Sequence, residues 1–115
     1  MVVVIFEVEI KEAFMDQYLS LAAGLKDQLQ SADGFIRAER FTSLAKEGKL
    51  LSLSVWENEE AVSRWRQLAD HRRCQQQGRE TMFKKYQITV ASKLRTYSMD
   101  ERDEAPQDSN EFFAK

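Results

Sequence analysis

The first segment of the chain has only hydrophobic residues at its even positions, and this period of two predicts a strand over residues 2–10, with Val3, Ile5, Glu7 and Glu9 on its other side. From Glu12 the hydrophobic spacing changes to steps of three and four, which is typical of one face of a helix. This helix is expected to end at the sequence Ser-Ala-Asp-Gly, where Gly34 can adopt a left-handed backbone. The apolar face of the helix consists of Phe14, Tyr18, Leu21, Leu25 and Leu29.

Two more strands and a second helix are expected next. Residues 35–43 and 50–57 have strand patterns and flank a loop long enough for a hairpin. Asn58 is a good N-cap, and Glu59 and Glu60 would lie in the first turn of the following helix, near the positive end of its dipole. Its apolar face consists of Val62, Trp65, Leu68 and Ala69.

A further helical stretch over residues 71–83 would carry Cys74, Met82 and Phe83 inward, and residues 86–97 are expected to form the last strand. The order strand, helix, strand, strand, helix, strand is that of the ferredoxin-like split βαβ unit. The sequence therefore predicts an α+β domain over residues 1–98, with two helices on one face of a four-stranded antiparallel sheet.

The composition changes after this domain. Residues 98–115 contain six acidic and two basic residues and the only proline of the chain. Residues 99–115 are therefore predicted to form a flexible acidic tail. Phe112 and Phe113 are its only hydrophobic anchors, and they are either mobile or docked onto a partner subunit.

Composition and charge exclude several classes of protein. A net charge of -2 argues against a general nucleic-acid binder. One cysteine permits no internal disulfide, and no apolar run approaches the roughly 20 residues of a membrane span. The expected protein is soluble and cytoplasmic, without nucleic-acid or membrane partners.

A locally basic segment holds the only histidine and the only cysteine. Between Arg64 and Lys85 there are seven Lys or Arg residues against Asp70 and Glu80. Such a run usually forms a solvated helical face. There are two alternatives: the basic segment could pair with the acidic tail, or it could steer an anionic ligand toward a pocket.

Two helices cover only one face of a sheet, so the composition of the other face is informative. That face is expected to be too apolar for open water and too polar for a dry core, which predicts coverage by a second copy of the chain. The resulting homodimer would enclose a partly polar space suited to a small aromatic ligand, unless the face is a dimer interface alone. The residues assigned to this face are Val3, Ile5, Glu7, Glu9, Ser52, Ser54, Trp56, Gln87 and Thr89.

His71 is the first candidate for a catalytic base, because its ordinary pKa lies near neutrality. The alternatives are Glu7, whose pKa partial burial would raise, and Glu9, which is expected to be exposed. Trp56 could stack on a flat substrate, whereas Trp65 either packs in the core or contacts the ligand. Ser54, Phe83 and Tyr86 complete the predicted substrate contacts, with Tyr97 a further donor.

No metal, phosphate or dinucleotide motif accompanies these residues. Cys74 has no second cysteine, and His71 has no second histidine, so the usual His/Cys metal site cannot be built. Glycine-rich nucleotide motifs are also absent from the sequence. No dedicated cofactor is therefore expected.

The segment over residues 54–97, SVWENEEAVSRWRQLADHRRCQQQGRETMFKKYQITVASKLRTY, resembles the antibiotic biosynthesis monooxygenase domain family. Members of this family are small dimeric α+β-barrel proteins, and the strand–helix–strand order of the first half, with GFIRAERF, agrees with the same fold. The resemblance implies a small monooxygenase that oxidises an aromatic or quinol-like molecule with dioxygen and without a dedicated cofactor. The residues that carry it are Trp56, Asn58–Glu60, Trp65, His71, Gln75, Gly78–Arg79, Phe83, Tyr86 and Arg95–Tyr97.

A haem-degrading branch of the same family provides an alternative. Trp65 would stand where that branch has its ring-distorting tryptophan. However, Gln75 occupies the position of the axial histidine, and His71 lies one helical turn earlier, about 5–6 Å along the axis. The branch also uses an asparagine on its first strand, where this chain has Glu7 or a neighbour. A dimeric binding module without catalysis is the third alternative.

Overall fold

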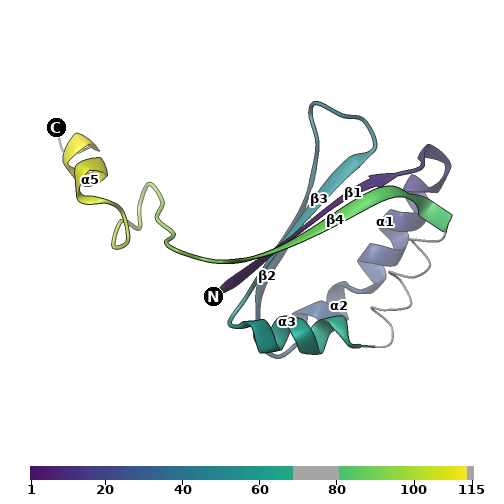
Figure 1. Cartoon of the computed structure of the whole chain (residues 1–115), viewed down its shortest axis with the longest axis horizontal. Coiled ribbons are helices and arrows are strands. Elements are labelled where there is room, and N and C mark those ends of the chain that lie inside the picture. The colour runs from purple at the N-terminus through teal and green to yellow at the C-terminus, as the bar shows by residue number, and fades with distance from the viewer. Residues whose placement is uncertain (69–80, 114–115) are drawn as a thin grey trace.

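The computed structural model describes residues 1–68 and 81–113, and its centre is a single antiparallel sheet (Figure 1). The strands are β1 (Val2–Ile10), β2 (Phe35–Thr42), β3 (Lys49–Trp56) and β4 (Phe83–Ser92), in the spatial order β2-β3-β1-β4. The N-terminal strand therefore lies in the middle of the sheet, paired with β3 on one side and β4 on the other. This arrangement confirms the predicted four-stranded antiparallel sheet.

The helices before the last strand lie together on one side of the sheet (Figure 1). A 3-10 turn, η1 (Glu12–Phe14), leads into α1 (Met15–Gly24) and α2 (Lys26–Gln30). The sequence predicted one continuous helix here, but Leu25 interrupts it directly after Gly24, the least favourable residue of the segment for a helix interior. Among the described residues, no helix is long and apolar enough to cross a membrane.

The other helix of this layer, α3 (Glu59–Arg66), begins as predicted. The Asn58 side-chain oxygen accepts a hydrogen bond from the Ala61 backbone amide at 2.9 Å. The helix ends at Arg66, so Leu68 lies beyond it and is exposed. Most of the predicted helical stretch over residues 71–83, including Cys74, lies outside the described residues.

The register between β1 and β3 corrects one part of the sequence interpretation. Residues that pair directly across antiparallel strands share a face, and Val4 pairs with Ser54 while Phe6 pairs with Ser52. The prediction that Ser52, Ser54 and Trp56 lie on the uncovered face is therefore wrong, because they lie under the helices. The predicted alternation of side chains within each strand was correct. Which residues of one strand share a face with those of the next depends on how the strands pair. The uncovered face instead carries Val3, Ile5, Glu7, Leu51, Leu53 and Val55.

The last strand also begins earlier than the sequence indicated. β4 occupies Phe83–Ser92 rather than residues 86–97, so Phe83 belongs to the sheet and not to a helix. Its pairing with β1 shifts between Glu9 and Ile10, where Phe83 is the partner of Ile10. Met82, immediately before the strand, is fully buried, as predicted.

Two tryptophans form the centre of the hydrophobic core. Trp56 at the end of β3 is 1% exposed, and Trp65 of α3 is 9% exposed. Their ring centroids lie 6.2 Å apart, and the ring of Phe35 meets Trp56 edge-on at 5.4 Å. This cluster attaches α3 to the sheet.

A buried carboxylate connects the other end of the sheet. Glu9 is buried and forms ion pairs with Lys46, in the β2–β3 loop, and with Lys85 of β4, at 3.0 Å from the latter. The expectation that Glu9 is exposed is wrong, because the two lysines cover it. Glu9 thus links both neighbours of β1 and is not free to act as a base.

The segment after β4 extends away from the sheet and ends in α5 (Gln107–Phe113) (Figure 1). Arg102 organises it, since its guanidinium donates to Asn110 Oδ1, Ser109 Oγ and the Ser98 carbonyl at 2.8–3.0 Å. The same group lies 5.2 Å from the centroid of the Tyr97 ring. The sequence did not indicate this helix. The domain boundary after residue 98 and the flexibility of the tail stay predictions.

Gly34 provides a stability test of the contact between α3 and the sheet. Its φ is +82°, and a Cβ built there would lie 2.5 Å from the Ala61 Cβ. Gly34→Ala is therefore expected to lower the free energy of unfolding by about 1–3 kcal/mol, measured by urea denaturation.

The matched control for Gly34→Ala is Gly24→Ala. A Cβ at Gly24 meets nothing within 4 Å, and the position lies at the end of α1. This change is expected to raise stability by about 0.4–1 kcal/mol. Equal effects of the two substitutions would contradict the packing described for Gly34.

Candidate ligand-binding pocket

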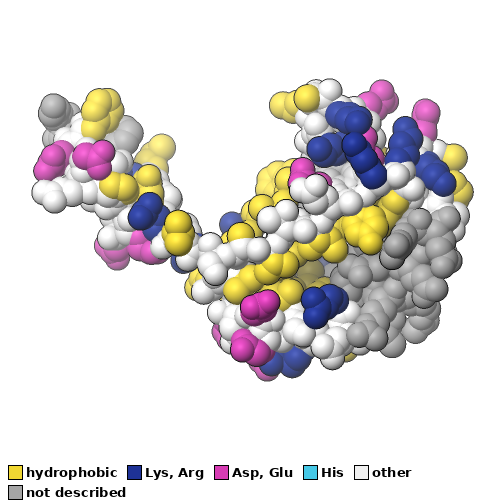
Figure 2. All heavy atoms as spheres, viewed as in Figure 1, with side chains coloured by type: hydrophobic (Ala, Val, Ile, Leu, Met, Phe, Trp, Pro, Cys, Tyr) yellow, Lys and Arg dark blue, Asp and Glu magenta, His cyan; other side chains and the backbone are white. Residues whose placement is uncertain are grey.

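A cavity of about 640 Å³ lies between the helices and the covered face of the sheet. Its volume is within the range of about 300–1,000 Å³ that is usual for small-molecule sites. Ile88 and Val90, about half exposed, belong to a band of hydrophobic side chains along β4 (Figure 2). The floor is formed by Val4, Phe6, Ser52, Ser54, Ile88 and Val90, and the roof by Leu21, Leu25 and Leu29.

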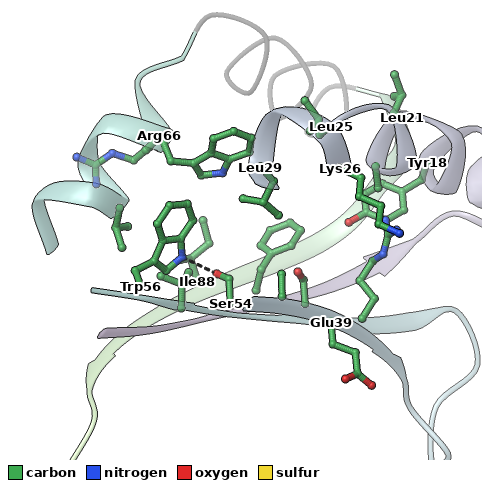
Figure 3. A pocket seen from close by; sticks show the side chains of 18 of the residues that line it. Tyr18, Leu21, Leu25, Lys26, Leu29, Glu39, Ser54, Trp56, Arg66 and Ile88 are labelled. Carbon is green, nitrogen blue, oxygen red and sulfur yellow. Dashed lines mark hydrogen bonds between the residues drawn. The ribbon is translucent and has the colours of Figure 1, made fainter. Parts of the chain in front are cut away.

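The two core tryptophans form one end of the cavity. Trp56 Nε1 donates a hydrogen bond to Ser54 Oγ at 2.9 Å, which fixes the indole against the sheet (Figure 3). Because this bond uses a lone pair of the hydroxyl, the hydroxyl hydrogen of Ser54 can still be donated to a ligand. Trp65 from α3 also lines the cavity.

The opposite end of the cavity is polar. Tyr18 of α1 turns its hydroxyl toward the cavity, and Lys26 of α2 extends toward the sheet (Figure 3). Arg40 of β2 pairs with Ser52 and therefore lies on the covered face. Burial raises the pKa of Tyr18, and the positive charge of Arg40 opposes this increase to a smaller extent. The phenol is thus held in its neutral form, which can donate a hydrogen bond.

The sequence interpretation missed this polar end. It treated Tyr18 as a member of an apolar helix face and did not single out Lys26 or Arg40. The strand alternation in β2 was the available signal, since Arg40 lies two positions from Ala38 and shares its face. A charge at an inward position of a strand is a better indicator of a site than a charge on a helix.

The predicted contact residues divide between the cavity and other places. Trp56, Trp65, Ser54 and Phe83 all line the cavity. Tyr86 does not line it, and is 41% exposed, with its ring 5.8 Å from Phe6 and 5.9 Å from Phe83. That each of these residues contacts a substrate stays a prediction.

The two predicted bases lie elsewhere. His71 lies outside the described residues. Glu7 is on the uncovered face of the sheet, 3.5 Å from Lys49 Nζ, and does not line the cavity. Its role as a base stays a prediction for a space formed on that face, since the sheet separates it from this cavity. Within residues 1–68 and 81–113, no cluster of three or more His, Cys, Asp or Glu side chains could hold a metal ion.

Sequence comparison identifies the family. Residues 1–77 match the profile of the antibiotic biosynthesis monooxygenase family, and the chain belongs to this family. It is also 39% identical over 90 residues to a protein of Pyricularia oryzae named jasmonate monooxygenase ABM. That match covers 78% of this chain and 42% of the relative, so the chain spans less than half of the length of this curated relative.

Solved structures share the fold at low sequence identity. A protein from Deinococcus radiodurans superposes with a TM-score of 0.77 at 14% identity, covering 86% of this chain and 98% of its own. SnoaB, a cofactor-independent oxygenase from Streptomyces nogalater, gives a TM-score of 0.71 at 15% identity, covering 83% of this chain and 94% of its own. These matches confirm the predicted fold class.

The titration of Tyr18 tests the placement of its phenol. Burial raises the pKa of Tyr18 above the ordinary 10.0. Between these two pKa values the native state therefore retains the phenol proton while the unfolded state loses it. Stability is therefore fully present below pH 10.0 and falls as the pH rises from there through the native pKa. Tyr18→Phe is expected to reduce this alkaline loss of stability, measured by urea denaturation at several pH values.

Phenolate absorbance provides an independent reading. The titration of the native protein should show one phenol more than that of Tyr18→Phe, and this phenol should ionise above the ordinary pH range of tyrosine. Two results would contradict the buried position of Tyr18. One is an equal loss of stability with rising pH in the native protein and in Tyr18→Phe, and the other is an ordinary pKa for the phenol that Tyr18→Phe removes.

Proposed function

We propose that this chain is a monooxygenase that oxidises a small aromatic or quinol-like molecule in the cavity under the helices, with dioxygen and without a dedicated cofactor. The observation that carries the proposal is the cavity itself, which has a mostly apolar wall and a few fixed polar groups in a member of this monooxygenase family. Such a composition suits a small organic ligand.

The class of substrate follows from the tryptophan end. Trp56 and Trp65 provide aromatic surfaces, and Phe6 and Phe83 continue them along the floor. Aromatic and quinol-like molecules can stack on such surfaces. The name of the Pyricularia relative indicates that it acts on jasmonate, which also contains a ring, and this supports ring-containing substrates for the present chain.

The chemistry requires little from the protein. A base removes a proton from the bound phenol or quinol, and the electron-rich anion reduces dioxygen directly. One oxygen atom becomes a carbonyl oxygen on the ring, and the other leaves as water with the two hydrogens that the phenol or quinol loses, so the substrate itself is the reductant and the product is a quinone. We assign the base to His71, and Ser54 as a donor toward developing negative charge. Glu7 is the alternative base only for a molecule bound on the uncovered face of the sheet, where its side chain lies.

We further propose that two chains associate through the uncovered faces of their sheets. This face carries the half-buried apolar side chains of Val3, Ile5, Leu51 and Leu53, and in Figure 1 no helix of the described chain covers it. Apolar faces of this kind are usually covered by a partner. Glu7 and Lys49 would lie within the same interface. The single cysteine supports a reducing, cytoplasmic compartment.

Haem is the alternative cofactor, and the described lining residues give it limited support. Among them only Tyr18 and Met82 belong to residue types that ligate haem iron. Burial raises the pKa of Tyr18, which disfavours the phenolate that would ligate iron. No step is therefore assigned to haem.

Oxygen uptake tests the proposed reaction. The purified full-length chain is expected to consume dioxygen with a polycyclic phenol or quinol, without added metal, flavin or haem, measured with an oxygen electrode against heat-denatured protein. His71→Ala should lower the rate by about 10²-fold or more, since a general base contributes about 10²–10⁴-fold. Trp65→Phe, which keeps an aromatic wall, should retain most of the activity.

The same preparations distinguish the haem alternative. A haemin titration is expected to give no saturable Soret band and no bleaching when ascorbate is added in air. A saturable 1:1 band that bleaches, together with loss of activity in Trp65→Phe but not in His71→Ala, would overturn the proposed reaction in favour of haem degradation.

A further inference from the structure

The cavity is polarised along its length, and the sheet register explains why. On the covered face, β3 presents Trp56, then Ser54, then Ser52, and Arg40 pairs with the last of these. Tyr18 lies at the same end as Arg40, because its ring is 5.6 Å from that of Phe83 and its phenol interacts electrostatically with the guanidinium. Trp56 and Lys26 are therefore at opposite ends of the cavity (Figure 3).

The positive charges at this end have no partner within the described part of the chain. Lys26 and Arg40 both line the cavity, and neither forms an ion pair with a carboxylate of residues 1–68 or 81–113. Glu39 precedes Arg40 in β2 but pairs with Leu53, and its carboxylate points away from the cavity on the other side of the sheet (Figure 3).

The third cation of the lining does not contribute to this end. Arg66 belongs to α3, and its guanidinium turns away from the cavity (Figure 3). It donates a hydrogen bond to Ser63 Oγ at 3.4 Å within its own helix. The excess positive charge that faces the cavity is therefore confined to Lys26 and Arg40.

We infer that the Tyr18, Lys26 and Arg40 end of the cavity is an acid-binding subsite, which selects ring-containing molecules that carry a carboxylate. This inference rests on the proposed function, because it defines the substrate class of the same cavity. The carboxylate would accept hydrogen bonds from the two cations and from the phenol, whose neutral form burial favours. The ring would then lie toward Trp56 and Trp65.

This orientation has a chemical consequence. An acid group held by Lys26 and Arg40 places the opposite, apolar part of the molecule beside the tryptophans and Ser54. For a phenol or quinol that carries the acid group, oxidation is therefore directed to a carbon remote from the carboxylate. Molecules without the acid group can enter the apolar part of the cavity, but they bind more weakly and without a fixed direction.

Intrinsic fluorescence provides a direct measurement of binding, because Trp56 and Trp65 are the only tryptophans of the chain and both line the cavity. The probes are cyclohexylacetate and its primary amide, which have the same ring and do not absorb in the tryptophan band. Binding of each probe is measured on the full-length chain at neutral pH and constant ionic strength.

The native chain is expected to bind the acid about tenfold more tightly than the amide, since each exposed cation contributes a factor of about two to five. In the double variant Lys26→Met/Arg40→Met this preference should fall to about twofold or less, with the affinity for the amide unchanged. Arg37→Met is the matched control, because Arg37 lies on the same strand but pairs with Val55 on the uncovered face. It should retain the full preference.

The outcomes separate this subsite from the proposed function. Binding of the amide without any preference for the acid, or a preference that survives in the double variant, would overturn the acid-binding subsite and leave the apolar cavity as a binding site. Absence of binding by both probes at millimolar concentration would overturn both the subsite and the cavity as the place of reaction. A preference lost equally in Arg37→Met would show a general charge effect and also contradict the subsite.

Discussion

The pairing of β1 with β3 is the constraint on which the site depends. Because Val4 lies opposite Ser54 and Phe6 opposite Ser52, the small polar residues and Trp56 are placed under the helices and not on the open face. A shift of the register by one residue would move all of them to the other side of the sheet. Glu9 contributes to maintaining this register, since its ion pairs with Lys46 and Lys85 connect β1 to both of its neighbours.

The helix layer then divides the covered face into a core and a cavity. At one end, Trp56 and Trp65 pack tightly against Ala61, and the approach of the chain at Gly34 makes this contact possible. Further along the sheet, the leucines of α1 and α2 face the strands but do not fill the space between the helices and the sheet. The same aromatic cluster is therefore both the end of the hydrophobic core and one wall of the cavity.

The two faces of the sheet serve different purposes. The covered face is hollow and polarised, with aromatic groups at one end and a buried phenol and cations at the other. The uncovered face carries apolar side chains along β1 and β3 from Val3 to Leu51, with Glu7 and Lys49 beyond them, and suits association with a second chain. This separation would allow one small sheet to hold the proposed ligand on one face and the proposed second chain on the other.

The fold class could be predicted from the residue pattern alone, since the changes of hydrophobic period predict the four strands, and Asn58 predicts the start of α3. The sequence also selected Trp56, Trp65, Ser54 and Phe83, which the structure brings to one cavity. The face on which they lie depends on the pairing of the strands in the folded chain, because periodicity fixes the alternation within a strand but not the phase between strands. For the same reason the pairing removed Glu7 from the cavity and brought Arg40 to it. Tyr18 and Arg40 belong to different elements, and their proximity depends on the packing of α1 over the sheet.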